Sequence, residues 1–202
     1  MIAIIDYGVG NLFSLCSSFA AIGHDVTVSG DPAVLEKADK LILPGVGAFE
    51  DAADKLRQSG LDKLVRQKAA AGVPLMGICL GMQLLFEKSF EYGEHEGLGL
   101  LKGQVVGMAG KLPSDLKIPH MGWNQLDKTK DGKLLQNVKD GEFVYFVHSY
   151  FATDCTESVA AITNYGIPMT AAVECGNIFG CQFHPEKSSE VGLRILETFC
   201  EL

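Results

Sequence analysis

The sequence predicts an α/β fold: a mixed, largely parallel open sheet with flanking helices, and antiparallel strands in the second half of the chain. In the first half, short apolar runs alternate with helix-compatible stretches, which is typical of parallel strands buried on both faces. In the second half, strand-like runs are joined by short turns at residues 164–166 and 175–177, which is typical of hairpins. We expect these antiparallel strands to be added to the same sheet.

The first strands are expected where apolar residues cluster, at residues 2–5, 26–28, 41–43 and 75–78. Asp31 and Pro32 provide an N-cap and a first-turn proline for the helix after the second of these strands. The Ala-rich stretch from Leu61 to Ala71 predicts a further helix. It should close at Gly72, because glycine readily adopts the left-handed conformation that ends many helices.

Further strands are expected at residues 104–108, 143–147, 159–163, 169–174 and 178–183. Ser188 or Ser189 should cap a final amphipathic helix. The polar segment at residues 128–133 predicts a mobile loop. No internal repeat or linker divides the chain, so a single domain over residues 1–202 is expected.

The composition argues against several classes of function. The chain has 202 residues, 47% of them hydrophobic and 21% charged, as in an ordinary globular enzyme. A net charge of -8 and a pI near 5.1 argue against nucleic acid and anionic membranes as partners. No apolar stretch approaches the length of a membrane span. The opening apolar run has no basic region before it and is interpreted as a first strand, not a signal peptide.

Cysteine and histidine spacing gives no sign of a disulfide framework or a metal site. The six cysteines form no C-x-x-C pair, which predicts reduced thiols and a cytoplasmic location. The five histidines lack metal-ligand spacing, so no metal is assigned. Gly8 and Gly10 lack the third glycine of a dinucleotide fingerprint, because Phe13 stands in its place. No cofactor is therefore expected.

Cys79 is the clearest catalytic candidate. The apolar run ending at Ile78 passes into a Gly-x-Cys-x-Gly turn with Gly77 and Gly81, and a helix-compatible stretch follows. Such a turn presents the thiol at a helix start, where unpaired backbone N–H groups and the helix dipole favour negative charge. The alternative is a buried structural cysteine, which is common for this residue type.

His184 and Glu186 are the partners that a nucleophilic thiol requires: a base that takes its proton and a carboxylate that orients the base. In an extended backbone, residues i and i+2 project to the same side, and Pro185 favours extended geometry at His184. We therefore expect the two side chains to be paired. The alternative is a surface turn.

Glycines flank Val46 at the end of the third strand, where open α/β sheets place their active sites. Gly45 and Gly47 would let the backbone approach a substrate closely and let the peptide reorient. An oxyanion hole built from main-chain N–H groups requires both properties. The alternative is an ordinary turn between a strand and a helix.

Together these motifs resemble those of the class I glutamine amidotransferases, whose glutaminase domain uses a Cys-His-Glu triad. The resemblance covers nearly the whole chain and rests on residues 6–12, 44–49, 77–83, 119–124, 147–150 and 184–188. Two segments, the opening Asp-Tyr-Gly-x-Gly-Asn and the later Met-Gly-Trp-Asn, resemble in particular those family members that work with a separate cyclase subunit. The resemblance implies a flavodoxin-like three-layer fold, and no catalytic position departs from the family pattern.

The resemblance implies that Cys79 attacks the side-chain amide of glutamine. His184, oriented by Glu186, would protonate the departing ammonia, and water would then hydrolyse a γ-glutamyl thioester. The N–H of Leu80 and, after a peptide reorientation, that of Val46 would hold the oxyanion.

The resemblance also implies that Gln83 and the backbone around Ser149 and Tyr150 hold the amino-acid end of glutamine. The alternatives are ordinary roles on a helix surface and at the end of a strand. In the isolated chain we expect low activity. The Gly45–Val46 peptide would then turn its carbonyl toward the site and its N–H away.

The resemblance also implies a partner, a (β/α)₈ cyclase subunit that receives ammonia in a heterodimer. Met121 and Trp123 are expected to anchor this interface, because aromatic residues dominate such hot spots. The alternative is that Trp123 belongs to the core. Asn11 and Lys187 lie beside the active-site motifs in the sequence and are candidates for transmitting partner occupancy to the triad.

Other functions stay open. A cysteine peptidase or a stress-response α/β protein also places a cysteine on such a turn, but is not expected to combine it with a distant His-Pro-Glu and Pro-Gly-Val-Gly. A catalytically silent binding subunit would not need both partners of the cysteine. The nearest rival is another class I glutaminase, such as the subunit serving pyridoxal phosphate synthesis.

Overall fold

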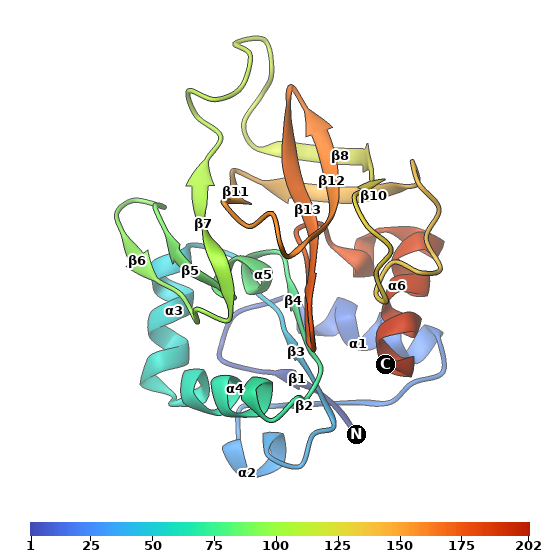
Figure 1. Ribbon diagram of the computed structural model, residues 1–202. Helices are drawn as coiled ribbons and strands as arrows, with labels where there is room; N and C mark the ends of the chain where they lie inside the picture. The colour runs from blue at the N-terminus through green and yellow to red at the C-terminus, as the bar shows by residue number, and fades with distance from the viewer.

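The computed structural model describes residues 1–202, and its central layer is an eight-stranded sheet with the order β2-β1-β3-β4-β14-β13-β12-β9 (Figure 1). The pairs from β2 across to β14 are parallel, and the remaining pairs are antiparallel. The predicted mixed, largely parallel sheet is thereby confirmed. Its strands are β1 (Ile2–Ile5), β2 (Val26–Ser29), β3 (Lys40–Leu43), β4 (Leu75–Ile78), β9 (Asp127–Lys128), β12 (Val159–Tyr165), β13 (Ile167–Cys175) and β14 (Ile178–Cys181).

Helices cover both faces of this sheet because side chains alternate along its strands. Ala3 and Ile5 belong to one core cluster with the apolar residues of α3 and α4, whereas Ile4 belongs to a second cluster with those of α1 and α6. The helices are α1 (Leu12–Ala21), α2 (Pro32–Leu35), α3 (Phe49–Gln58), α4 (Leu61–Ala70), α5 (Leu80–Leu84) and α6 (Ser189–Glu201), with a 3-10 turn η1 (Pro185–Lys187) before α6.

The second half of the chain departs from the prediction, because not all its strands extend the main sheet. One smaller sheet has the order β11-β7-β5-β6 and another pairs β10 with β8. In addition, β14 runs parallel to β4 rather than antiparallel. The elements of the smaller sheets are β5 (Phe86–Ser89), β6 (His95–Glu96), β7 (Leu101–Gly107), β8 (His120–Gln125), β10 (Phe143–His148) and β11 (Tyr150–Thr153).

The physical reason is that an alternating pattern shows which side chains of a strand are buried, and nothing more. Along β10, buried side chains such as Val144 and Phe146 alternate with more exposed ones, so one face of the strand is covered and the other is not. This alternation identifies a half-buried strand, but it does not identify the strand's neighbours. Only the folded chain decides that β10 pairs with β8 and not with the main sheet.

Two local helix signals are confirmed. The Asp31 carboxylate accepts a hydrogen bond of 2.9 Å from the N–H of Ala33, and Pro32 occupies the first position of α2. Helix α4 ends just before Gly72, which has a φ of 84°. In both cases the deciding interaction lies within a few residues of the signal.

Ser188 occupies the N-cap position of α6, as predicted, but its side chain makes no cap hydrogen bond. Its hydroxyl instead donates to the carbonyl of His184 at 2.6 Å and accepts from the N–H of Tyr145 at 2.9 Å. Ser188 is fully buried, so its hydroxyl satisfies two backbone groups of the neighbouring turn instead of the helix start.

The segment at residues 128–133 is not a free loop. Lys128 lies in β9 and pairs with β12, and its ammonium donates to the carbonyls of Leu135 and Val138. At the other end, the Glu174 carboxylate accepts from the backbone N–H groups that follow Gly132. Polar composition predicted mobility, but these contacts tie the segment to the sheet.

Strands β1, β3 and β4 are parallel, so their carboxyl ends meet at one edge of the sheet. Asp6, Pro44 and Cys79 directly follow them there. No helix of this chain has the length and apolar character needed to cross a membrane. All six cysteines are free thiols.

Candidate active site

Cys79 occupies a strained turn between β4 and α5. Its φ of 54° and ψ of −113° lie in a region that residues other than glycine rarely adopt. The Cys79 N–H donates to the carbonyl of Cys181 at 2.7 Å, which ties the turn to β14. Such strain is typical of a nucleophile held on a sharp bend between a strand and a helix.

The glycines on either side of Cys79 permit close packing of this turn. A Cβ on Gly77 would lie 2.6 Å from the carbonyl oxygen of Gly81. A Cβ on Gly81 would overlap the carbonyl oxygen of Leu43 at the end of β3. Both positions therefore exclude any side chain, and the thiol is held close to the end of β3.

His184 and Glu186 are paired, as the sequence predicted. The His184 Nδ1 and the Glu186 Oε1 are 2.8 Å apart, and the two side chains are only 4% and 2% exposed. The alternative of a surface turn is therefore wrong. The geometry differs in one respect: His184 is extended, but Glu186 lies in η1, so the side chains meet across a 3-10 turn and not along an extended strand.

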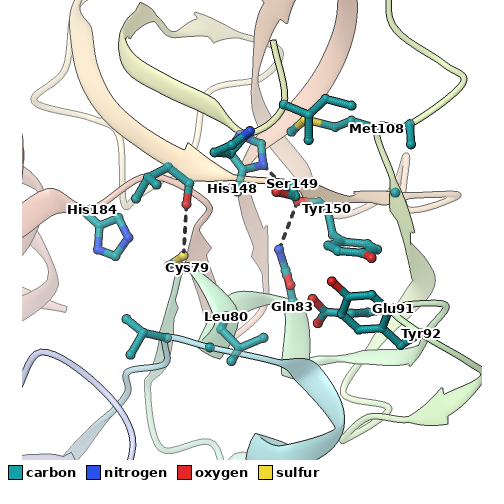
Figure 2. Close-up of a pocket in the computed structure, with 17 residues that line it drawn as sticks. Cys79, Leu80, Gln83, Glu91, Tyr92, Met108, His148, Ser149, Tyr150 and His184 are labelled. Carbon is teal, nitrogen blue, oxygen red and sulfur yellow. Dashed lines mark hydrogen bonds between the residues drawn. The ribbon is translucent and has the colours of Figure 1, made fainter.

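One nitrogen of the His184 ring has a partner within the chain and the other does not. Nδ1 is engaged by Glu186, whereas Nε2 is buried and makes no hydrogen bond within the chain. Cys79 and His184 line the same cavity, as Figure 2 shows. Nε2 is thus the ring atom available to exchange a proton with the thiol or with a bound substrate.

The electrostatic surroundings favour the charged form of His184. Burial of the ring acts to lower its pKa, but interactions with Cys79 and Glu186 outweigh that effect and raise the pKa to about 9. His184 is therefore an imidazolium at neutral pH when Cys79 carries a negative charge. This charge state suits a group that must deliver a proton to a leaving amine.

Gln182 is a contact of Cys79 that the sequence analysis missed. Its Nε2 lies 3.8 Å from the Cys79 sulfur, and its Oε1 accepts a hydrogen bond of 3.0 Å from the Gln83 side chain. The sulfur also lies 4.0 Å from the carbonyl oxygen of Val147. A glutamine inside the apolar run at 178–183 was the available signal, because a buried amide requires partners.

The site opens into a cavity of about 530 Å³, large enough for a small amino acid (Figure 2). The cavity lies where the end of β4, the loop that follows β3 and the two smaller sheets meet. Its lining residues are Val46, Gly47, Cys79, Leu80, Gln83, Glu91, Tyr92, Gly107, Met108, Ala109, Ile118, Pro119, Val147, His148, Ser149, Tyr150 and His184.

Gln83, Ser149 and Tyr150, the predicted substrate residues, all line this cavity. The Gln83 side chain donates to the carbonyl of Tyr150 at 3.1 Å. The Ser149 carbonyl accepts from the N–H of Met108 at 3.0 Å. Because both carbonyls are engaged by the protein, the segment that joins β10 to β11 is held in a defined conformation beside the cavity.

Glu91 is a second residue that the sequence analysis missed. Its carboxylate lines the cavity and accepts a hydrogen bond of 2.6 Å from the N–H of Phe49. Partial burial raises its pKa. A carboxylate on the wall of the cavity can attract a cationic group of a ligand. Nothing in the polar turn around Glu91 marked it, because its position depends on the folded cavity.

The predicted oxyanion segment, Gly45–Gly47, lies against the turn that holds Cys79. A Cβ on Gly45 would lie 2.7 Å from the Gly81 nitrogen and 3.0 Å from the Tyr7 hydroxyl. Gly47 has a φ of 94°, and Val46 is 42% exposed on the cavity wall. The glycines are therefore needed for close approach and for the backbone bend. The roles of the Val46 and Leu80 N–H groups stay predictions.

The predicted interface residues lie in different settings. Met121 and Trp123 on β8 are 62% and 51% exposed, so the alternative that Trp123 belongs to the core is wrong. The Lys187 ammonium lies 5.9 Å from the centre of the Tyr145 ring, and that ring packs edge-on against Trp123. Asn11 caps α1 by accepting from the N–H of Ser14.

A family model described as "Glutamine amidotransferase class-I" matches residues 3–201. Several curated relatives are similar over their full length, and each is named "Imidazole glycerol phosphate synthase subunit HisH". The relative from Sulfurimonas denitrificans is 51% identical, with 98% of this chain and 97% of the relative covered. The one from Aquifex aeolicus is 50% identical, with 97% and 94% covered. The one from Lactococcus lactis is 48% identical, with 99% and 98% covered.

Solved structures share the fold at lower identity. One titled "Crystal structure of glutamine amidotransferase" has a TM-score of 0.77 at 20% identity, with 99% of this chain and 97% of that chain covered. Another, titled "Structure of PurLQS from Thermotoga maritima", has a TM-score of 0.76 at 20% identity and the same coverage. These likenesses confirm the predicted fold class.

Proposed function

We propose that this chain, which belongs to the glutamine amidotransferase class-I family, is the glutaminase subunit of an imidazole glycerol phosphate synthase. Glutamine is its substrate, and it works within a complex of more than one subunit. It hydrolyses glutamine to glutamate and ammonia, and the ammonia passes to a (β/α)₈ cyclase partner in histidine biosynthesis. The assignment to this particular synthase rests on relatives that match over nearly their full length and are about half identical to this chain.

One observation carries the chemistry: a strained cysteine and a buried histidine paired with a carboxylate line the same cavity. Cys79 has a positive φ on a glycine-flanked turn, and His184 is held by Glu186 at 2.8 Å with its Nε2 unpaired. Nucleophile, proton carrier and orienting carboxylate are thus arranged as cysteine-dependent acyl transfer requires.

In the first half-reaction, the Cys79 thiolate attacks the side-chain amide carbon of glutamine. The carbonyl electron pair moves onto oxygen, and the N–H groups of Leu80 and Val46 stabilise this oxyanion. When the tetrahedral intermediate collapses, the carbon–nitrogen bond breaks and His184 donates its proton to the departing nitrogen. The products are ammonia and a γ-glutamyl thioester on Cys79.

In the second half-reaction, water attacks the thioester while His184, now neutral, takes its proton. The carbon–sulfur bond breaks, glutamate leaves, and the Cys79 thiolate and His184 imidazolium are restored. Glu186 keeps the His184 ring oriented and stabilises its charge throughout. The protons balance over the cycle, and the steps need only these side chains and water.

The cavity walls support a free amino acid as the substrate. Glu91 offers a carboxylate to the α-ammonium group, and the backbone of Ser149 and Tyr150 lies beside the position for the α-carboxylate. Gln83 holds this segment through the Tyr150 carbonyl. A substrate with a blocked α-amino group should lose the charge pairing with Glu91.

The partner would cover the face that carries Met121 and Trp123. Lys187 and Asn11 are the residues proposed to transmit its binding to the triad. We assign a cytoplasmic location, where six free thiols remain reduced. We also treat residues 1–202 as one glutaminase domain.

The test of the chemistry is covalent labelling with 6-diazo-5-oxo-norleucine, a reactive glutamine analogue, followed by peptide mapping. The expected result is one adduct on Cys79 that glutamine protects against. A stoichiometric adduct on another residue, or none, would contradict the assignment.

The test of the partner is a glutaminase assay of the full chain with purified synthase subunits. The imidazole glycerol phosphate cyclase subunit should raise glutamine hydrolysis strongly, whereas the pyridoxal phosphate synthase subunit should not. The reverse pattern would assign the chain to the other glutaminase.

A further inference from the structure

Two buried histidines outside the proposed triad form a continuous chain of hydrogen bonds. His120 on β8 and His148 on β10 face each other in the strand register, and His120 Nδ1 lies 3.0 Å from His148 Nε2. The two residues are 3% and 6% exposed. His148 lines the cavity, whereas His120 lies behind it.

At each end of this series of hydrogen bonds, the histidine meets a group that can only donate or only accept. At the inner end, His148 Nδ1 lies 2.8 Å from the carbonyl oxygen of Tyr150, which can only accept (Figure 2). At the outer end, His120 Nε2 lies 3.3 Å from the amide nitrogen of Asn124, which can only donate. That amide is itself oriented, because it donates to the carbonyl of Asn164 and its oxygen accepts from the N–H of Gln125.

These end groups determine the tautomer of both rings. His148 must carry its proton on Nδ1 to donate to Tyr150, so its Nε2 accepts. His120 must then carry its proton on Nδ1 to donate to His148, and its Nε2 accepts from Asn124. A second proton on either ring would place two donors face to face.

Burial acts in the same direction. It lowers the pKa of His120 to about 4 and that of His148 to about 3. The ring of His120 is enclosed by aromatic faces, with Phe146 at 4.9 Å and Tyr165 at 4.1 Å between ring centres. The groups facing His148 that carry or gain charge are His120 and His184, and a positive charge on either disfavours a further one on His148. The pair is therefore neutral while His184 is charged.

At its inner end, the series of hydrogen bonds reaches a backbone carbonyl that Gln83 also holds. The Tyr150 carbonyl accepts from both His148 and Gln83. A single carbonyl held by two side chains cannot rotate without breaking both bonds. The adjoining Ser149–Tyr150 backbone is held with it.

We propose that His120 and His148 are positioning residues: locked in one neutral tautomer, the pair fixes the Ser149–Tyr150 backbone that binds the amino-acid end of glutamine. This rests on the proposed function, because it takes glutamine to be the occupant of the cavity. Neither histidine touches the reacting atoms. Losing the hydrogen bond from His148 to the Tyr150 carbonyl therefore weakens substrate binding more than it slows the chemical step.

The test compares two substitutions of nearly equal size at one position, in the full chain assayed with its synthase partner. His148→Asn places an amide N–H where Nδ1 donates to Tyr150, whereas His148→Leu places a methyl group there. We expect His148→Leu to raise the KM for glutamine about tenfold, with kcat changed by less than about threefold. We expect His148→Asn to keep the KM within about threefold of the unsubstituted chain.

The same comparison at His120 covers a failure of the His148 variants to fold, which thermal unfolding would reveal. His120→Asn retains a donor toward His148 and should raise KM less than His120→Leu does. Equal KM values for the Asn and Leu variants at both positions would overturn the proposal. So would a loss confined to kcat.

A second readout separates this proposal from the assignment of the triad. Iodoacetamide, which needs no amino-acid site, should modify Cys79 at similar rates in all four variants. Saturation by 6-diazo-5-oxo-norleucine should require higher concentrations only in the Leu variants. If the unsubstituted chain neither hydrolyses glutamine nor forms this adduct, the proposed function fails. If it does both and the Leu variants saturate normally, only the positioning role fails.

Discussion

The Tyr7 hydroxyl donates a hydrogen bond of 2.7 Å to the carbonyl oxygen of Pro44, which joins the loops that follow β1 and β3. Pro44 directly precedes the Gly45–Gly47 segment, so the contact holds one end of the proposed oxyanion hole. Tyr7 is 7% exposed, and burial, with a smaller effect of charge on Cys79, raises the pKa of its phenol. Tyr7 is therefore a permanent donor to this carbonyl.

Tyr7→Phe should destabilise the chain and slow glutamine hydrolysis. It leaves a buried carbonyl without its donor, which costs about 1–3 kcal/mol in the free energy of unfolding. Looser placement of the oxyanion segment should lower kcat about tenfold with little change in KM. Urea unfolding and steady-state kinetics measure the two effects. Tyr165→Phe, which removes an exposed bond to the Lys117 carbonyl, is the control and should change unfolding by less than about 0.5 kcal/mol.

Cys79→Ala should abolish glutamine hydrolysis and leave ammonia-dependent synthesis by the complex intact. Without the thiol no thioester forms, and the expected loss in kcat is at least about 10³-fold. Substitution of the exposed Cys175 by serine is the control and should change neither activity. Glutamine turnover that survives in Cys79→Ala would remove the cysteine from the mechanism.

His184→Asn should reduce kcat nearly as much as Cys79→Ala, because the two residues act as one unit. Glu186→Gln should retain a residual rate, since a neutral amide can still orient the ring but stabilises its charge less. The double variant Cys79→Ala/His184→Asn should be no slower than the single ones. Mild and equal effects at His184 and Glu186 would mean that the pair only shapes the turn.

The stability that protonated His184 contributes to the chain should fall as pH rises from about 6.5 to 9. The pKa of His184 is raised from 6.5 to about 9 in the folded chain, so the imidazole of His184 binds more proton in the folded state than in the unfolded state in this window. The stabilisation is fully present below pH 6.5 and is lost as pH passes 9. Glu186→Gln removes one source of the raised pKa and should flatten the dependence. Urea midpoints at several pH values measure this dependence. If the midpoints of the unsubstituted chain and of Glu186→Gln changed equally with pH, the charge assigned to His184 would be refuted.

The isolated chain should be a poor glutaminase that the cyclase partner activates. We expect the Gly45–Val46 peptide to turn its N–H away from the oxyanion position when the chain is alone, because the flanking glycines permit two peptide orientations. Removing one oxyanion donor costs about 10²–10³ in rate in a well-studied protease, so partner addition should raise kcat by about that factor. Glutaminase rates measured with and without the partner test this. High activity of the free chain would refute the gating but not the triad.

The sequence by itself determined the features that depend on neighbouring residues. Apolar runs at residues 2–5 and 75–78 became buried strands, and Asp31 with Pro32 began a helix, because these signals act within one or two turns of chain. The signal for the bend at Cys79 was equally local, since glycine is the only residue type that fits at positions 77 and 81. The His184–Glu186 pair was predictable for the same reason, although its 3-10 geometry was not.

Only the tertiary structure decided which distant segments meet. It placed β7 and β10 in separate sheets, brought Gln182 and Glu91 to the cavity, and joined His120 to His148 across two strands. The physical reason is that a residue's polarity and spacing report whether it is buried, but not what it is buried against. Hydrogen-bond partners and charge states in a site depend on packing between segments far apart in the chain, and that packing is set by the whole fold.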